Sequence, residues 1–202
     1  MEGISVIPIL YESGETKFQS NGIAQLYDSE SCTITEARNG EFELELVYPV
    51  QGDWATDLIK YRYILAQPND FDEPHAFRIY DVKKDLAGNS ITVKGASKIT
   101  EELSGNVVLP FFVGGASPED IWKELLLHTT DPIPYEFKSD IGSRTDFEVK
   151  EITNVLSVLM GEENSITSVL GGEVKKTNKR ITLYNIRGRE SVTTIRPRKN
   201  LK

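Results

Sequence analysis

The stretch 75–97, HAFRIYDVKKDLAGNSITVKGAS, predicts a long β-hairpin on which the rest of the chain is built. Apolar and polar residues alternate in its first half, which places Phe77 and Ile79 on one face of a strand. Arg78 and Tyr80 fall on the other face. We therefore expect this strand to be half buried, with Phe77 and Ile79 in the core.

The second half of the stretch repeats this period over residues 90–96, with Ile91 and Val93 on one face. The polar connection between the halves ends in Gly88 and Asn89, two residues that tolerate the positive φ of a hairpin loop. The stretch therefore predicts a pair of antiparallel strands. It contains no motif for a reaction and does not indicate a function.

A strand with one solvated face is predicted earlier in the chain, at residues 41–48. Its apolar residues share one face and its acidic residues the other, namely Phe42, Leu44, Leu46 and Tyr48 against Glu41, Glu43 and Glu45. Carboxylates spaced along one strand splay apart and need partners from elsewhere to enclose a cation. We therefore predict no metal site here.

Further strands are predicted at residues 4–11, 26–27, 32–38 and 61–66, with a turn at Asn39-Gly40. Pro8 suggests that the first of these strands lies at an edge or carries a bulge. Residues 54–58 are expected to form a helical turn. Short strands joined locally by turns favour an antiparallel barrel or sandwich over residues 1–108.

The pattern changes after residue 108. An apolar connection at residues 109–115 leads to Ser117, which has the features of a helix N-cap, because Pro118 takes the first helical position and Asp120 the capping-box position. The apolar residues of this helix lie at helical spacing and are interpreted as core rather than as a cofactor site: Ile121, Trp122, Leu125 and Leu126.

Two shorter helices and a hairpin complete the second region. Asn154 is placed to cap one helix, residues 165–170 form another, and residues 173–186 are expected to form a hairpin that turns at Asn178. Short strands are expected between the helices. This order of elements predicts a small α+β domain over residues 109–190.

Charge is unevenly distributed along the 202 residues. The net charge is −8, but residues 173–202 carry +8 and the preceding residues −16. This asymmetry fits a solvated strand face, a contact with an acidic surface of another subunit, or nucleic-acid binding.

No apolar run approaches the roughly eighteen residues of a membrane span, and acidic Glu2 argues against a signal peptide. The single Cys32 excludes an internal disulfide and a multi-cysteine metal site.

Several short phrases along the chain resemble one protein family. They are Tyr48-Pro49, Phe77-Arg78-Ile79-Tyr80-Asp81-Val82, Ile91-Thr92-Val93-Lys94-Gly95, Gly171-Gly172-Glu173, Ile181-Thr182-Leu183, Arg187-Gly188-Arg189 and Lys199-Asn200-Leu201. In these phrases the chain resembles the N-terminal region of phage minor structural proteins. This family comprises the tail-associated hub proteins, also called prophage endopeptidase tail proteins, of siphophages and prophages of Gram-positive bacteria.

The resemblance implies an α+β fold that is mainly antiparallel β, similar to phage baseplate hub proteins. It implies a β-barrel-like domain at 1–108, a small α+β domain at 109–190, and the start of a second, truncated barrel at 191–202. The full-length protein would be made in the bacterial cytoplasm and form a homotrimeric ring at the virion tail tip, with the distal tail ring protein and the tape-measure protein as partners. We expect no cofactor, no membrane partner and no specific nucleic-acid binding.

Catalysis within these residues is not expected, and the tail-associated lysin activity of the family would belong to C-terminal domains. A thiol peptidase needs Cys32 beside His75 or His128. Cys32 instead lies on a predicted strand, where a lone cysteine is usually a small packing residue. The histidines stand far apart with no HExxH pattern, and residues 115–117 do not complete a GxSxG elbow. We therefore predict no catalytic, cofactor-binding or metal-binding residues.

Two alternatives remain open from the sequence. One is a host-receptor or cell-wall carbohydrate-binding module, because aromatic side chains gather around one predicted loop: Trp54, Tyr61, Tyr63 and Phe71. The other is a part of a tail-associated peptidoglycan endopeptidase. An adhesin predicts an exposed aromatic groove away from subunit contacts, whereas a hub predicts a ring with a lumen.

Overall fold

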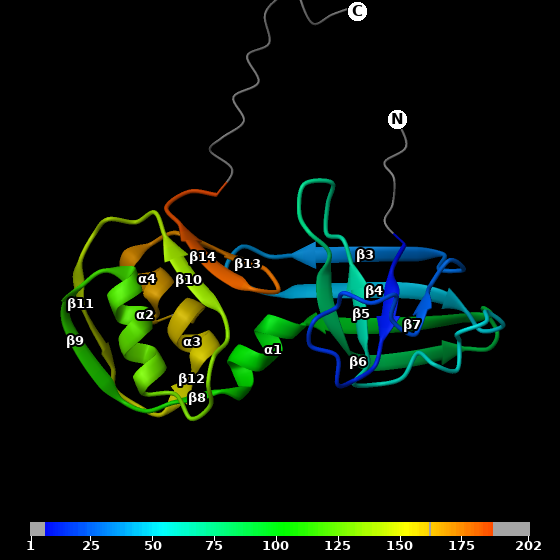
Figure 1. The fold of residues 1–202 in the computed structure, drawn as a ribbon, viewed down its shortest axis with the longest axis horizontal. Coiled ribbons are helices and arrows are strands. Elements are labelled where there is room, and N and C mark those ends of the chain that lie inside the picture. Colours follow the sequence, from blue (N-terminus) through cyan, green and yellow to red (C-terminus); the bar gives the residue numbers. More distant parts are fainter. Residues whose placement is uncertain (1–6, 162, 188–202) are drawn as a thin grey trace, which may run out of the picture.

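The computed structural model describes residues 7–161 and 163–187 (Figure 1). Its first part is an antiparallel sheet of seven strands in the order β2-β1-β5-β6-β7-β4-β3. The strands are β1 Ile9–Tyr11, β2 Ala24–Gln25, β3 Ser31–Glu36, β4 Phe42–Pro49, β5 Tyr63–Ala66, β6 His75–Asp85 and β7 Ser90–Ser97. The sheet curls into a half-barrel. Its outer strands β2 and β3 do not pair with each other, so the expected barrel is open over the described residues.

The hairpin formed by β6 and β7 is the centre of this sheet, as the alternation predicted. Phe77, Ile79, Ile91 and Val93 are completely buried. Strand β4 pairs with the other side of β7, so that Leu46 lies opposite Val93. The hairpin therefore joins both halves of the sheet and supplies the middle of its core.

Three local predictions differ from the structure. Strand β1 starts at Ile9 and pairs with both β2 and β5, so Pro8 precedes an inner strand and not an edge strand. The strand expected at 26–27 lies at Ala24–Gln25. Residues 53–57 form consecutive turns closed by short-range backbone hydrogen bonds, without a helix, and Trp54 there packs against the core of the sheet.

The second part of the chain wraps short strands around helices (Figure 1). Its elements are α1 Lys98–Gly105, β8 Val107–Val108, β9 Phe111–Ala116, α2 Pro118–Leu127, β10 Glu136–Ser139, β11 Thr145–Val149, β12 Thr153–Asn154, α3 Val155–Met160, α4 Ile166–Leu170, β13 Glu173–Lys176 and β14 Arg180–Tyr184. The strands form three small sheets, β10-β14-β13, β11-β9 and β12-β8. Strand β14 pairs in parallel with β10 and antiparallel with β13.

The predicted helix starts are confirmed. The Ser117 hydroxyl accepts a hydrogen bond from the backbone of Asp120, whose carboxylate accepts one from the Ser117 backbone, which completes a capping box. The Asn154 side chain accepts from the backbone of Ser157 at the start of α3. Residue 165 caps α4 in the same way. Local sequence alone therefore determines where these helices begin.

Helix α1 and the strands β8, β9 and β12 of the second part were not predicted. Helix α1 was missed because only Ile99 and Leu103 on it are apolar, and both are buried in the core of the second part. Strand β9 overlaps the segment 109–115 that was expected to be a connection, and it pairs with β11. Two glycines near the end of β9 obscure its strand pattern in the sequence.

The chain has two main hydrophobic cores. One lies within the half-barrel and includes Phe42, Phe77 and Val93. The other lies in the second part, extends from Ile99 to Leu183, and contains the inner faces of the helices. No buried apolar cluster of the described residues spans both parts.

Candidate functional site

The residues considered for catalysis lie in three different places. Cys32 is on the edge strand β3, and His75 begins β6. Strands β4 and β7 lie between β3 and β6 in the sheet. Two intervening strands correspond to about 14 Å across the sheet. His128 caps the C-terminus of α2, where its ring stacks on Phe111. The structure does not bring a thiol and an imidazole together from these residues.

His75 instead makes a buried hydrogen bond with Ser97, a residue that the sequence did not single out. The His75 Nε2 atom lies 2.8 Å from the Ser97 Oγ atom, and both residues are almost completely buried. Burial and the nearby charges of Lys176 and Lys98 lower the pKa of His75 to about 3. Because the Ser97 hydroxyl has no access to solvent, it cannot reach a polymer substrate. The His75–Ser97 hydrogen bond instead connects the start of β6 to the end of β7.

The buried imidazole predicts a loss of stability in acid. Because the folded protein holds His75 neutral down to about pH 3, the unfolded chain takes up the proton first below about pH 6.5. The contribution of neutral His75 to the free energy of unfolding is complete above pH 6.5. It is lost toward pH 3, by up to about 1.4 kcal/mol per pH unit. In His75→Gln the free energy of unfolding should fall less steeply over this range in urea titrations. Equal slopes in the two proteins would contradict a buried neutral His75.

The acidic face of β4 is occupied by neighbouring side chains. The Glu43 carboxylate accepts a hydrogen bond from the Tyr80 hydroxyl at 3.3 Å, and the Glu45 carboxylate lies 3.4 Å from the Lys94 ammonium. Among residues 7–161 and 163–187, no three potential metal ligands form a cluster. These glutamates act as cross-strand partners.

The four aromatic residues considered for sugar binding do not form one groove. Trp54 packs against the half-barrel core, and Tyr63 is buried on the opposite face of the sheet against Phe18. Tyr61 is exposed and its ring lies under the Arg78 guanidinium. Phe71 is 97 % exposed and lines the cavity between the β13–β14 hairpin and the half-barrel, which is described below. An aromatic platform from these four side chains is therefore not present in the structure.

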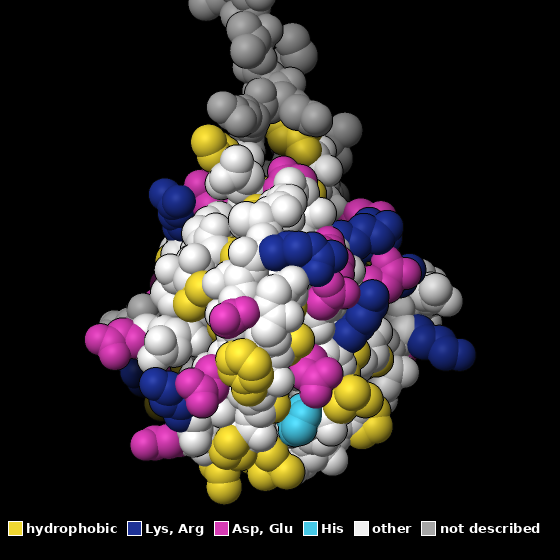
Figure 2. Space-filling view, turned by 90° about the vertical axis from the view of Figure 1, so that its left-hand side faces the viewer, with side chains coloured by type: hydrophobic (Ala, Val, Ile, Leu, Met, Phe, Trp, Pro, Cys, Tyr) yellow, Lys and Arg dark blue, Asp and Glu magenta, His cyan; other side chains and the backbone are white. Residues whose placement is uncertain are grey.

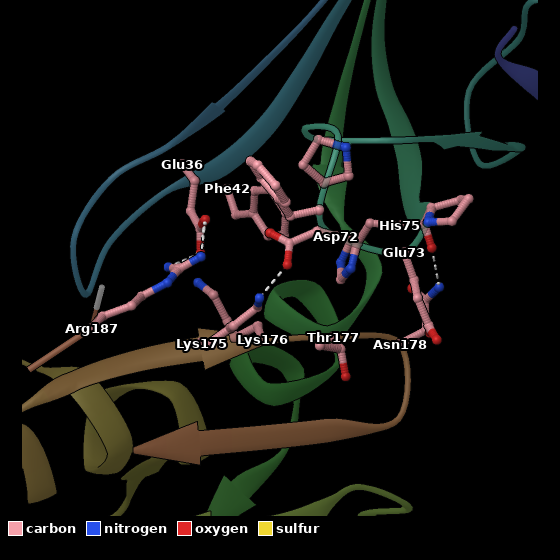
Figure 3. Close-up of a pocket in the computed structure, with 13 residues that line it drawn as sticks. Glu36, Phe42, Asp72, Glu73, His75, Lys175, Lys176, Thr177, Asn178 and Arg187 are labelled. Carbon is pink, nitrogen blue, oxygen red and sulfur yellow. Dashed lines mark hydrogen bonds and ion pairs between the residues drawn. The ribbon is translucent and has the colours of Figure 1, made fainter. Parts of the chain in front are cut away.

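A concave site lined by charged and polar side chains lies where the β13–β14 hairpin meets the half-barrel (Figure 3). A cavity of about 190 Å³ is lined there by both parts of the chain. The Lys175 ammonium pairs with the Asp72 carboxylate, and the Arg187 guanidinium donates two hydrogen bonds to the Glu36 carboxylate at 2.6 and 2.8 Å. Burial alone would raise the pKa of Asp72, but hydrogen bonds from Lys175 and Asn69 outweigh it and lower this pKa.

Two asparagines complete the contact between the parts. Asn39, in the turn between β3 and β4, donates to the Gly172 carbonyl at 2.9 Å and accepts from the Val174 backbone at 2.7 Å. Asn178, at the predicted turn of the C-terminal hairpin, donates to the Pro74 carbonyl at 2.8 Å and accepts from the backbone N–H of Ala76 at 3.0 Å. The two parts therefore meet mainly through polar groups, more than a hundred positions apart in sequence.

Lys176 is the most buried cation of this contact, with 4 % of its surface exposed. Its ammonium donates to the Gly40 carbonyl at 2.9 Å. Burial lowers the pKa of Lys176 to about 8, although the nearby Glu36 carboxylate opposes this shift. Two acid–base pairs, Glu36–Arg187 and Asp72–Lys175, and the bond of Lys176 to a backbone carbonyl occupy most charges of the cavity, which is the arrangement of a structural contact.

Three of the five basic residues at positions 173–187 bind acids of their own chain. Besides the pairs of Lys175 and Arg187, the Arg180 guanidinium donates to the Glu136 carboxylate at 2.8 and 2.9 Å. The charge asymmetry of the sequence also fitted a contact with an acidic surface of another subunit. For Lys175, Arg180 and Arg187, the acidic partners lie in the same chain. The remaining basic residues of positions 188–202 lie outside the described residues.

An exposed apolar patch lies at the far end of the second part, and apolar side chains gather on this face in Figure 2. Its members are Leu109, Phe112, Leu127 and Ile152. They come from adjacent segments, because the backbone of Leu109 donates to that of His128, next to Leu127, and β8 pairs with the strand that follows Ile152. Clustered apolar surface of this kind is typical of a protein–protein interface.

No helix in the described part of the chain is long and apolar enough to span a membrane. No protein-family model matches the sequence, and a search of curated proteins found no significant match.

Among solved structures, the chain is similar in fold to the prophage tail protein gp18 from Listeria monocytogenes EGD-e, with a TM-score of 0.63 and 13% sequence identity. The match covers 88% of this chain and 50% of that one, so this chain spans about half the length of the Listeria protein. The phage-tail resemblance noted in the sequence therefore extends to the three-dimensional fold. The mainly antiparallel β architecture with few helices is shared with a prophage tail protein.

Proposed function

We propose that this chain is the N-terminal part of a structural protein of a phage or prophage tail. The observation that carries the proposal is the similarity of its fold to a prophage tail protein over 88% of its length. At 13% identity the common feature of the two proteins is the architecture, so the proposed role rests on the fold.

More specifically, we propose a baseplate hub at the virion tail tip. Three copies of the full-length protein would form a ring that joins the tail tube to the tip, in contact with the distal tail ring protein and the tape-measure protein. The exposed apolar patch around Leu109 and Leu127 supports a role in an assembly, because monomeric proteins rarely leave such surface uncovered. The paired side chains of the polar cavity support a role without catalysis.

Light scattering tests the oligomeric state that this role requires. The proposed full-length protein, with a second barrel after this chain, should be trimeric, with an interface on the order of 2,000 Å² or more, as in obligate assemblies. The 202-residue chain alone should be mainly monomeric, because the proposed second barrel supplies half of the interface. Added salt should weaken the trimer to the extent that basic residues after 187 face an acidic neighbour. A monomeric full-length protein would contradict the hub assignment, whereas a salt-insensitive trimer would contradict only the electrostatic contribution.

A further inference from the structure

The half-barrel and the second part are joined by a single backbone connection and a polar contact. Every strand up to Ser97 belongs to the seven-stranded sheet, and the elements from Lys98 to Tyr184 belong to the second part. No buried apolar cluster of the described residues contains side chains of both parts. Domains within a chain move relative to one another unless the interface between them is large and hydrophobic. Apolar packing therefore does not fix the angle between these two parts.

The ion pairs between the parts are only partly shielded from solvent. In the described part of the chain they are Arg187–Glu36, Lys175–Asp72, Arg38–Glu173 and Arg78–Glu101. Figure 3 shows the first two of these pairs beside the cavity. The exposed fractions of the eight side chains range from 19 to 71 %. Ion pairs that water reaches contribute little to stability, and salt screens them further.

Lys176 destabilises the contact that it helps to form. It is 4 % exposed, and within the described residues its ammonium donates one hydrogen bond, to the neutral carbonyl of Gly40. The nearby Glu36 carboxylate is already bound by Arg187. Burial lowers the pKa of Lys176 to about 8, which shows that its charge is poorly compensated. Separation of the two parts would return this ammonium to water.

The start of α1 is suited to act as a hinge. Ser97 ends β7 and precedes α1, but its hydroxyl is bound to His75 and does not cap the helix. Helix α1 contributes Ile99 and Leu103 to the core of the second part, so it moves with that part. A rotation at residues 97–98 would therefore lift the β13–β14 hairpin from the half-barrel and leave both cores intact.

We propose that the native protein opens at residues 97–98, so that the second part swings away from the half-barrel. In the open state the hairpin has left the half-barrel, while both hydrophobic cores remain folded. Rehydration of Lys176 favours the open state, and the Arg187–Glu36 pair favours the closed one. The angle between the parts is thus set by charged side chains. This property belongs to the chain itself and does not depend on a role in a phage tail.

Amide hydrogen exchange of the 202-residue protein, followed by NMR, measures the opening. Two backbone N–H groups are bonded across the contact. That of Ala76 donates to the Asn178 side chain at 3.0 Å, and that of Val174 donates to the Asn39 side chain at 2.7 Å. Both lose their acceptors when the parts separate. We therefore expect these two contact amides to report the same opening and to lose protection together when salt is added.

Two internal amides provide the reference. The Ile79 N–H is bonded to Arg62 within the half-barrel, and the Val155 N–H is bonded to Asn106 within the second part. Opening at the hinge leaves both of these hydrogen bonds in place. The contact amides should therefore be less protected than the internal amides by about ten-fold or more.

Lys176→Met should tighten the contact. The substitution removes the buried charge and keeps an unbranched side chain, so protection of the contact amides of Ala76 and Val174 should rise several-fold. Lys179→Met is the matched control, because Lys179 is exposed in the turn of the same hairpin. This control should leave the protection of the contact amides unchanged.

Arg187→Gln should loosen the contact. It removes the ion pair with Glu36, so protection of the contact amides should fall several-fold while the internal amides stay protected. Arg180→Gln is the matched control, since it removes a pair of the same type with Glu136 inside the second part. Protection of the contact amides should be the same in this control as in the unmodified protein.

Small-angle X-ray scattering distinguishes a hinge motion from fraying of the hairpin alone. A triple variant, with Asn39→Ala, Asn178→Ala and Arg187→Gln, loses bonds at three points of the contact. Its radius of gyration should exceed that of the unmodified protein, with an unchanged far-UV circular dichroism spectrum.

Three results would overturn the proposal. Equal protection of contact and internal amides would show that the parts separate only on global unfolding. Different responses of Ala76 and Val174 to the same substitution would indicate two local events in place of one opening. An unchanged radius of gyration in the triple variant would show that the parts stay together without the polar contact.

Discussion

Replacing Phe77 by alanine should lower the free energy of unfolding by about 3–5 kcal/mol. Phe77 is completely buried in the central hairpin, and its ring packs edge-to-face against that of Phe42 with 5.2 Å between the ring centroids. Strands β5 and β7 hold β6 from both sides, so the backbone has little freedom to close the cavity that the substitution would leave. Urea melts followed by circular dichroism measure the loss.

Leu86→Ala is the matched control for this substitution. Leu86 lies in the turn of the same hairpin and is 79 % exposed. Its removal should change the free energy of unfolding by at most about 0.5 kcal/mol. If Phe77→Ala cost less than 1 kcal/mol, the hairpin would not be the centre of the fold.

Trp122→Ala should cost a similar amount, about 3–5 kcal/mol, but in the other core. Trp122 is 3 % exposed on α2, and its ring stacks on Phe137 of β10 with 4.9 Å between the centroids. The side chain therefore joins the helix to the small sheet that carries the C-terminal hairpin.

Amide hydrogen exchange distinguishes where the Trp122→Ala loss occurs. Because no buried apolar cluster of the described residues spans both cores, amides in α2 and β10 should lose more protection than those in β6 and β7. Leu127→Ala, at the exposed end of the same helix, should leave both sets protected. Equal loss of protection in the two parts would contradict separate cores.

Local patterns were sufficient to predict the elements that local physics determines. The alternation around Phe77 gave the central hairpin and its buried face. The side chains of Ser117 and Asn154 gave the starts of two helices, because a cap depends on residues only three positions apart. The turn at Asn178 was also found, since the residues that favour turns act within a few positions.

The contact between the two parts could not be predicted in this way. Asn39 is an ordinary turn residue in the sequence, but it binds the backbone of residues 172 and 174. Glu36 and Arg187 are 151 positions apart, and only the packing of the hairpin on the half-barrel brings them together. The open edge at β3 was missed for the same reason, because strand spacing predicts a barrel whether or not its last strands meet.

Negative-stain imaging of the proposed full-length protein, in which a second barrel follows this chain, tests the central claim most directly. A hub role requires a particle that encloses a channel and has threefold symmetry, with two similar domains of each copy alternating around the ring. The proposed function predicts closed rings of this kind. Single elongated particles, or compact particles without a channel, would contradict it.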